Sequence, residues 1–210
     1  MKRRPGMIKK DGPMLFRVLL GMVVTGFVMF MGSVKADTGE REQAAANVSG
    51  AFLQELGEAM TREMKKDGPV EAIKVCAELA PEIANRLSRE NGWRVTRVGT
   101  RVRNPLLGMP DAWEQHVLEG FAARAEKGES LAGMSHGEVV AEPGGQYYRF
   151  MKAIPVQSKC LLCHGPTETI PESIKTLLKT HYPFDAATGY QAGDLRGAVS
   201  IKQPLGKPNR

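Results

Sequence analysis

The amino-acid sequence predicts an α+β domain with an antiparallel sheet and a helical N-terminal arm. Before residue 91, apolar residues recur every three or four positions, whereas after it they alternate along short segments bounded by glycine and proline. Helices followed by a group of strands are typical of an α+β arrangement rather than of alternating βαβ units. Residues 37–210 are long enough to form one globular domain with its own hydrophobic core.

Two helices are predicted in the first half of this domain. Residues 38–66 are rich in helix formers and carry one apolar stripe. Gly68-Pro69 ends that helix and begins a second one, with proline in the first turn. The second helix has Ile73 and Cys76 on its apolar face, and we expect Pro81 to kink or interrupt it.

The second half is predicted to contain four short strands. A capping-box pattern at residues 111–114 begins a helix that ends near Lys127. Residues 104–110 contain two X-Pro pairs and are expected to form a loop, and residues 171–179 a short helix. The turn at residues 143–145 joins two strands into a hairpin. The predicted strands are 93–98, 138–142, 147–155 and 197–202.

The first 36 residues have the features of a secretory signal. A basic segment is followed by an uncharged apolar run from Val18 to Val34 and by a small-residue cleavage pattern before Asp37. The run is close to the roughly 20 residues that span a bilayer, so an uncleaved membrane anchor is the alternative. Both readings place residues 37–210 outside the cytoplasm and predict a periplasmic protein, secreted or anchored to the membrane.

The positive net charge of the chain belongs to this leader. Residues 1–36 contain seven of the 29 lysines and arginines but only one of the 23 acidic residues. Residues 37–210 are therefore formally neutral, with 22 basic and 22 acidic side chains. A nucleic-acid-binding domain would carry a basic face, so nucleic acid is not an expected partner.

Cys160-x-x-Cys163-His164 is the attachment signature of a c-type haem. The two thiols can add to the two vinyl groups of a porphyrin, and the histidine that follows can bind the iron. A zinc site would need a second Cys/His pair, and the chain has only one other cysteine, Cys76. A thioredoxin-like pair would open a helix, but a Gly-Pro pair follows the motif directly. A local disulfide and coincidence are the remaining alternatives. The motif predicts one covalently bound haem c.

Several separate motifs along residues 45–203 resemble the Tll0287-like family, also designated DUF3365. The resemblance implies a PAS-like fold preceded by long helices, with one covalent c-type haem. It also implies that His164 and Cys76 hold the iron, while Cys160 and Cys163 anchor the porphyrin. Some family members are fused to signalling modules, which implies redox or small-molecule sensing. The matching segments are 72–81, 92–95, 101–105, 110–114, 148–155, 160–165 and 189–198.

The residue opposite His164 is open when the sequence is taken without the resemblance. A lone cysteine on an apolar helix face, such as Cys76, is more often a small buried hydrophobe than a ligand. Its rivals for the sixth position are His116, His136, His181, Met134 and Met151.

Basic residues of the first strand and the following loop have two interpretations. Arginine binds carboxylates by paired charged hydrogen bonds, so these residues are candidate partners of the haem propionates. They would otherwise form an ordinary solvated strand edge. They are Arg94, Arg97, Arg101 and Arg103.

Five further residues are predicted to be mainly structural. Trp93, Tyr147 and Tyr148 are candidates for packing on the porphyrin, but core packing is the expected role of at least two of them. Asp194 and Arg196 lie between glycines and are expected to be turn residues.

Together these observations predict an extracytoplasmic protein with one haem iron, acting as a redox or gas sensor for a ligand such as NO or CO. A small electron-transfer cytochrome is the alternative. An enzyme is not expected, because two ligands from the chain leave no open position on the iron. The partner would be a redox or signalling protein that the sequence does not identify.

Overall fold

The computed structural model describes the backbone of residues 15–206 and the side chains of residues 37–206. The chain divides into two compact units, one ending at Glu40 and one beginning at Arg41. The helices and strands are α1 (Leu15–Lys66), α2 (Gly68–Lys74), α3 (Ala80–Asn91), β1 (Arg94–Gly99), α4 (Pro105–Gly108), α5 (Ala112–Glu126), β2 (Ser135–Glu142), β3 (Gly145–Pro155), α6 (Leu161–His164), α7 (Glu172–His181) and β4 (Leu195–Pro204). A π-helical segment, η1 (Val75–Leu79), and three 3-10 turns, η2 (Leu131–Gly133), η3 (Ser158–Cys160) and η4 (Thr167–Thr169), complete this set.

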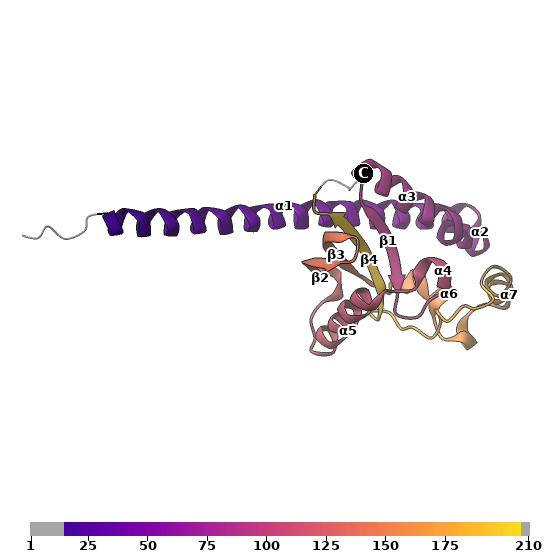
Figure 1. The fold of residues 1–210 in the computed structure, drawn as a ribbon. Helices are drawn as coiled ribbons and strands as arrows, with labels where there is room; N and C mark the ends of the chain where they lie inside the picture. The colour runs from indigo at the N-terminus through magenta and orange to yellow at the C-terminus, as the bar shows by residue number, and fades with distance from the viewer. Residues whose placement is uncertain (1–14, 207–210) are drawn as a thin grey trace, which may run out of the picture. The chain divides into compact units, whose positions relative to one another are not determined.

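The four strands form one antiparallel sheet in the order β1-β4-β3-β2 (Figure 1). The predicted α+β class, with helices first and an antiparallel sheet after them, is confirmed. The predicted hairpin is β2–β3, in which Glu142 pairs with Gly145. The last strand, β4, lies between β1 and β3, so the first and last strands of the chain pair with each other. The finer PAS-like assignment stays a prediction.

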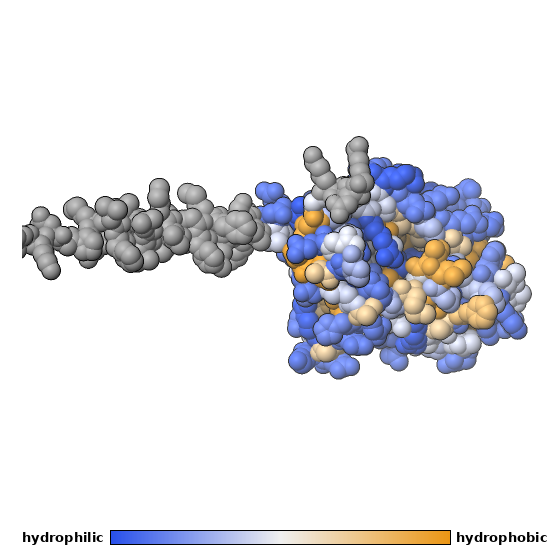
Figure 2. All heavy atoms as spheres, in the orientation of Figure 1, coloured by the Kyte–Doolittle hydropathy of each residue, from blue (hydrophilic) through white to orange (hydrophobic). Residues whose placement is uncertain are grey.

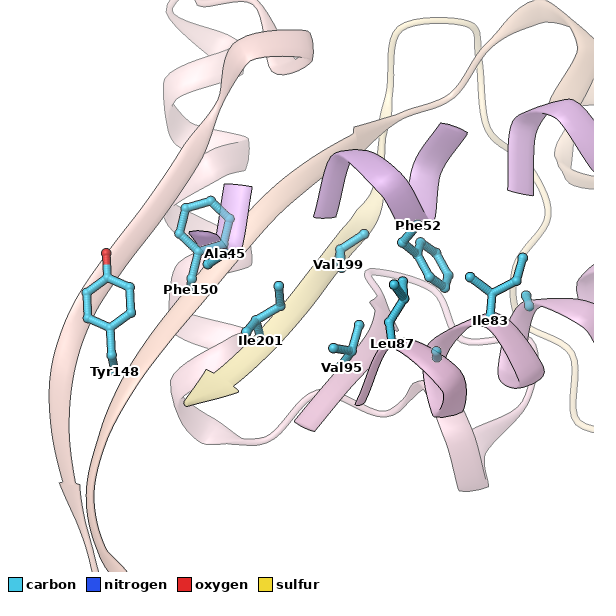
Figure 3. Packing of buried hydrophobic residues seen from close by; sticks show 11 residues of the cluster. Ala45, Phe52, Ile83, Leu87, Val95, Tyr148, Phe150, Val199 and Ile201 are labelled. Atoms are coloured by element: carbon cyan, nitrogen blue, oxygen red, sulfur yellow. The ribbon is translucent and has the colours of Figure 1, made fainter. Parts of the chain in front are cut away.

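One face of the sheet packs against α1 and α3 (Figure 3). The alternation along β1, β3 and β4 sends every second side chain to this face. Replacing a buried phenylalanine by alanine costs about 3–5 kcal/mol, so Phe52 is a main anchor of α1 on the sheet. This core includes Phe52, Ile83, Leu87, Val95, Phe150 and Ile201.

The other face packs against α5. Val117 and Phe121 of this helix meet Val98, Met151 and Ala198 of the sheet. The predicted capping box is present: the Asp111 side chain accepts from the Glu114 N–H, and the Glu114 side chain accepts from the Asp111 N–H. The helix therefore begins where the sequence predicted.

Pro81 interrupts the second predicted helix, as expected. Proline has no N–H, and its ring crowds the carbonyl four residues earlier, so a regular α-helix cannot pass through it. The chain responds with η1, whose cap residue Ala80 donates its N–H to the carbonyl of Val75, five residues earlier. Cys76 lies inside this π-helical segment.

The prediction of a loop at residues 104–110 was wrong in part, because residues 105–108 form the one-turn helix α4. The Asn104 side chain accepts a hydrogen bond from the Leu106 N–H at 3.1 Å, and Pro105 fits the first helical position.

No helix in the described part of the chain has the length and apolar character needed to cross a membrane. The signal peptide or membrane anchor predicted for residues 1–36 lies outside the described side chains and stays a prediction.

Candidate functional site

A cavity of about 360 Å³ lies beyond the end of β3, between α1, the α2–η1–α3 segment and the loops that follow β1 and β3. Its volume is within the ~300–1000 Å³ typical of small-molecule and cofactor sites. The walls are mainly apolar, and those from the helices include Leu53, Leu56, Met60, Ile73, Ala77 and Ala80.

The predicted attachment motif lines this cavity. Cys160 ends η3, and Cys163 and His164 belong to α6, the single helical turn that Gly165 caps. All three cysteines of the chain are free thiols and half-buried. Burial raises the pKa of the Cys163 thiol, and the charge of Arg103 opposes that rise. Both motif cysteines thus line the cavity as free thiols.

Cys76, which lies in η1 in the first half of the chain, lines the same cavity. The five rival ligands do not line it. Met134 and Met151 are buried under α5, and His116, His136 and His181 lie on other elements. Among the described residues, no three His, Cys, Asp or Glu side chains are close enough to hold a metal ion between them. The arrangement thus suits a group that lies between Cys76 and the motif better than it suits zinc.

His164 presents one ring nitrogen for binding. Its Nδ1 lies 2.6 Å from the carbonyl oxygen of Ala187. A carbonyl can only accept, so Nδ1 carries the proton and Nε2 keeps its lone pair. Nε2 has no hydrogen-bond partner among the described residues. Burial lowers the pKa of His164 well below its usual value, and the charges of Arg103 and Arg196 lower it further. The imidazole is therefore neutral at pH 7, the form that binds metals.

Residues 185–190 hold the motif in place. The Tyr190 N–H donates to the His164 carbonyl at 2.9 Å, and the Gly189 N–H donates to the Gly165 carbonyl at 2.7 Å. Gly189 has φ +74°, which favours glycine, and this geometry lets the loop follow the motif. Sequence reasoning predicted only a loop here.

Arg103 fastens this loop to the motif. Its Nε lies 3.0 Å from Asp185 Oδ2, and its Nη2 donates to the Cys163 carbonyl at 2.5 Å. Asp185 Oδ1 accepts from the Ala187 N–H at 2.8 Å, which fixes the carbonyl group that holds His164. Only 9% of the Arg103 side chain and 10% of the Asp185 side chain are exposed. We call these residues, Arg103, Asp185 and Ala187, the histidine clasp.

Of the four arginines predicted as propionate partners, the structure brings Arg97 and Arg103 to the cavity. Arg94 is exposed and Arg101 donates to the Thr188 carbonyl, and neither lines the cavity.

The expected role of Arg196 was wrong. It was predicted to be a turn residue, but it lies in β4 and lines the cavity. Asp194 is a turn residue as predicted, because its carboxylate accepts from the Gln191 N–H at 2.8 Å.

The aromatic residues Trp93, Tyr147 and Tyr148 do not line the cavity. Tyr148 is buried in the core, Trp93 packs against this core, and Tyr147 contacts Lys202. The expectation of core packing for at least two of these three residues is met. Tyr182, which sequence reasoning passed over, does line the cavity.

The residues fit a haem. A porphyrin needs an apolar slot, two thiols for thioether bonds and an imidazole with a free Nε2, and the cavity has all three. Leu107 lines the rim although 57% of it is exposed, and Figure 2 shows apolar residues on the surface over α4.

Comparisons with known proteins agree with this arrangement. The model of the Tll0287-like family matches residues 33–204. The crystal structure of the cyanobacterial haem protein Tll0287 superposes with a TM-score of 0.56 at 26% sequence identity, covering 80% of this chain and 94% of that one. No curated protein matches the sequence. The match to the family model spans most of the chain, and this protein therefore belongs to the Tll0287-like family.

Proposed function

We propose that this protein binds one haem c covalently and acts outside the cytoplasm as a redox or gas sensor. Cys160 and Cys163 would carry the thioether bonds, and His164 and Cys76 would bind the iron. The observation that carries this proposal is the convergence of all four residues on one apolar cavity, with His164 Nε2 left free. The haem nature of the related Tll0287 supports it.

The haem would supply one-electron redox chemistry and an iron that can bind small ligands. The chain's part is to hold His164 in the correct tautomer through the histidine clasp and to keep water away with the apolar walls. A thiolate from Cys76 would stabilise the oxidised iron and give a low reduction potential.

The π-helical segment around Cys76 supports sensing over simple electron transfer. Such segments are rare and often lie at functional sites, and Cys76 lies inside this one. A shift of Cys76 would therefore move η1 relative to α2 and α3. NO and CO are the ligands we propose for a state in which Cys76 has left, and a signalling protein is the proposed partner.

A small electron carrier is the second candidate. The exposed apolar side chains of Leu106, Leu107 and Met109 near the cavity rim favour it, since weak redox complexes use such patches. A carrier would keep both ligands in both oxidation states and would bind no gas. In either role, two ligands from the chain would occupy the iron, so we propose no enzymatic activity.

The location rests on residues 1–36. Their basic and apolar pattern supports export to the periplasm, with release or membrane anchoring as the two outcomes. Covalent attachment of haem by the bacterial pathway takes place in that compartment.

The test is production of the full chain together with the haem-attachment machinery, followed by denaturing electrophoresis and haem staining. We expect a stained band that the double variant Cys160→Ala/Cys163→Ala loses. Cys76→Ala is the matched control: it keeps the stained band and changes the spectrum of the oxidised protein. A parent chain without covalent haem would refute the proposal. Carbon monoxide binding to the reduced parent would favour the sensor, and its absence the carrier.

A further inference from the structure

Basic residues outnumber acidic ones around the cavity. Among residues 37–206, those that line the cavity include Arg97, Arg103, Arg196 and Lys159, and no aspartate or glutamate. Residues 37–210 are neutral as a whole, so this concentration of positive charge is local. Buried or half-buried charge without a partner is costly, which makes its presence beside an apolar cavity informative.

Two of these side chains already have partners. Arg103 pairs with Asp185 in the histidine clasp, and Lys159 donates to the Thr61 hydroxyl at 3.4 Å. The Arg97 side chain has no hydrogen bond or ion pair with any described residue. Arg196 uses Nη1 to donate to the Arg101 carbonyl at 3.0 Å, and its guanidinium lies 5.4 Å from the centre of the Tyr190 ring. Its other side-chain N–H groups have no hydrogen-bond partner among the described residues.

The pairing of β1 with β4 brings Arg97 and Arg196 to the same end of the sheet. Gly99 of β1 pairs with Gly197, the residue that follows Arg196. A Cβ atom at Gly99 would lie 2.7 Å from Arg196 Nη1, so this glycine makes room for the guanidinium. Burial lowers the pKa of Arg196, Tyr190 opposes this, and the charges of Arg97 and Arg103 lower it further. The two guanidinium groups thus repel each other in the absence of an anion.

We propose that Arg97 and Arg196 form an anion-binding end of the cavity that takes the propionate carboxylates of the bound haem. This inference rests on the proposed function and adds to it the orientation of the porphyrin, whose vinyl edge is fixed by Cys160 and Cys163. Arginine suits this role because its planar fork binds a carboxylate through two parallel hydrogen bonds.

The test compares haem-loaded Arg97→Gln and Arg196→Gln with the parent. Removing a positive charge near the iron stabilises its oxidised form, so the reduction potential falls. At an effective dielectric constant of ~20 and a separation of ~10 Å, the ratio of reduced to oxidised protein changes about tenfold. For a one-electron couple this corresponds to about 59 mV. The propionate bending band in the resonance Raman spectrum shifts in the same variants.

Two further variants make the test specific. Arg97→Lys keeps the charge and retains most of the potential. Arg94→Gln removes an arginine from the same strand but outside the cavity, and leaves both the potential and the Raman band unchanged. Arg97 is only half-buried, so its series decides the question even if Arg196→Gln fails to fold.

The inference is overturned if both glutamine variants behave like Arg94→Gln, or if Arg97→Lys shifts the potential as much as Arg97→Gln. These outcomes, obtained with a parent that stains for haem, leave the proposed function intact. A parent without covalent haem overturns both.

Discussion

The arginines on the two faces of the sheet differ in their partners. Under α5, Arg149 is 3% exposed and contacts three carboxylates, those of Asp111, Glu114 and Glu142. At the cavity, Arg97 and Arg196 contact no carboxylate of the described residues. The first arrangement neutralises the guanidinium charge with carboxylates of the chain, although Arg149 Nε is buried without a hydrogen-bond partner in the described part of the chain. The second leaves two positive charges without a carboxylate partner among the described residues. The contrast separates a site built for stability from one built for binding.

The largest expected effect on stability is at Arg149, on the face of the sheet that α5 covers. Arg149→Met leaves Glu114 buried with the Ser200 hydroxyl as its remaining side-chain donor, at 2.6 Å. Removing one partner of a buried ion pair costs about 3–5 kcal/mol, so we expect the free energy of unfolding to fall by that amount. Urea unfolding of the haem-free protein, with an unchanged m-value, measures it.

The matched variant at the cavity is Arg97→Met in the same haem-free protein. It removes a charge with no partner, so we expect a change of less than about 1 kcal/mol in either direction. Equal losses for the two variants would show that the cavity arginines are structural and would break the comparison.

A second, smaller effect is expected in the histidine clasp. Asp185→Asn removes the charged partner of Arg103, and a hydrogen bond to a charged group contributes about 1.5–3 kcal/mol. We expect a loss of that size in the free energy of unfolding. In the haem-loaded protein the Ala187 carbonyl is held less firmly, so added imidazole displaces His164 at lower concentration, as a spectral titration would show.

Asp194→Asn is the control for this substitution. It changes a carboxylate of the following loop that accepts from Gln191 and does not touch the clasp. An imidazole titration that is the same for Asp185→Asn and the parent would contradict a positioning role for the ion pair.

Much of the fold was predictable because its signals are local. The break at Pro81 follows from the missing N–H of proline, and the start of α5 follows from a capping box only four residues long. The Cys160–His164 motif is equally local. In contrast, α4 was missed because a single turn capped by Asn104 resembles a loop in sequence.

The parts of the site that could not be predicted depend on contacts between distant residues. Arg196 reaches the cavity because β4 pairs with β1, which precedes it by about a hundred residues. The histidine clasp joins Arg103 to Asp185 through side-chain geometry that no sequence pattern encodes. The presence of Cys76 opposite the motif was expected from family resemblance alone, and the structure brings it to the same cavity without testing whether it binds iron.

The smallest expected effect concerns how the contribution of Asp111 to stability depends on pH. Partial burial raises the pKa of Asp111, but hydrogen bonds from Arg149 and from the Glu114 N–H outweigh it, and the net pKa is lowered. The folded carboxyl therefore binds its proton less readily than the unfolded one. Its contribution to stability is complete above the usual pKa of about 3.9 and is lost as the pH falls through the lowered value.

Asp111→Asn isolates this contribution, because asparagine caps a helix about as well as aspartate. Asp111 is 45% exposed, so we expect a difference of less than about 1 kcal/mol. Urea unfolding from pH ~6 down to pH ~3 should show the parent losing its advantage over the variant near the acid end. A difference that stays constant across this range would mean that Arg149 holds Asp111 through shape rather than charge. The charge of Arg149 would then be balanced by Glu114 and Glu142, its two other carboxylate partners.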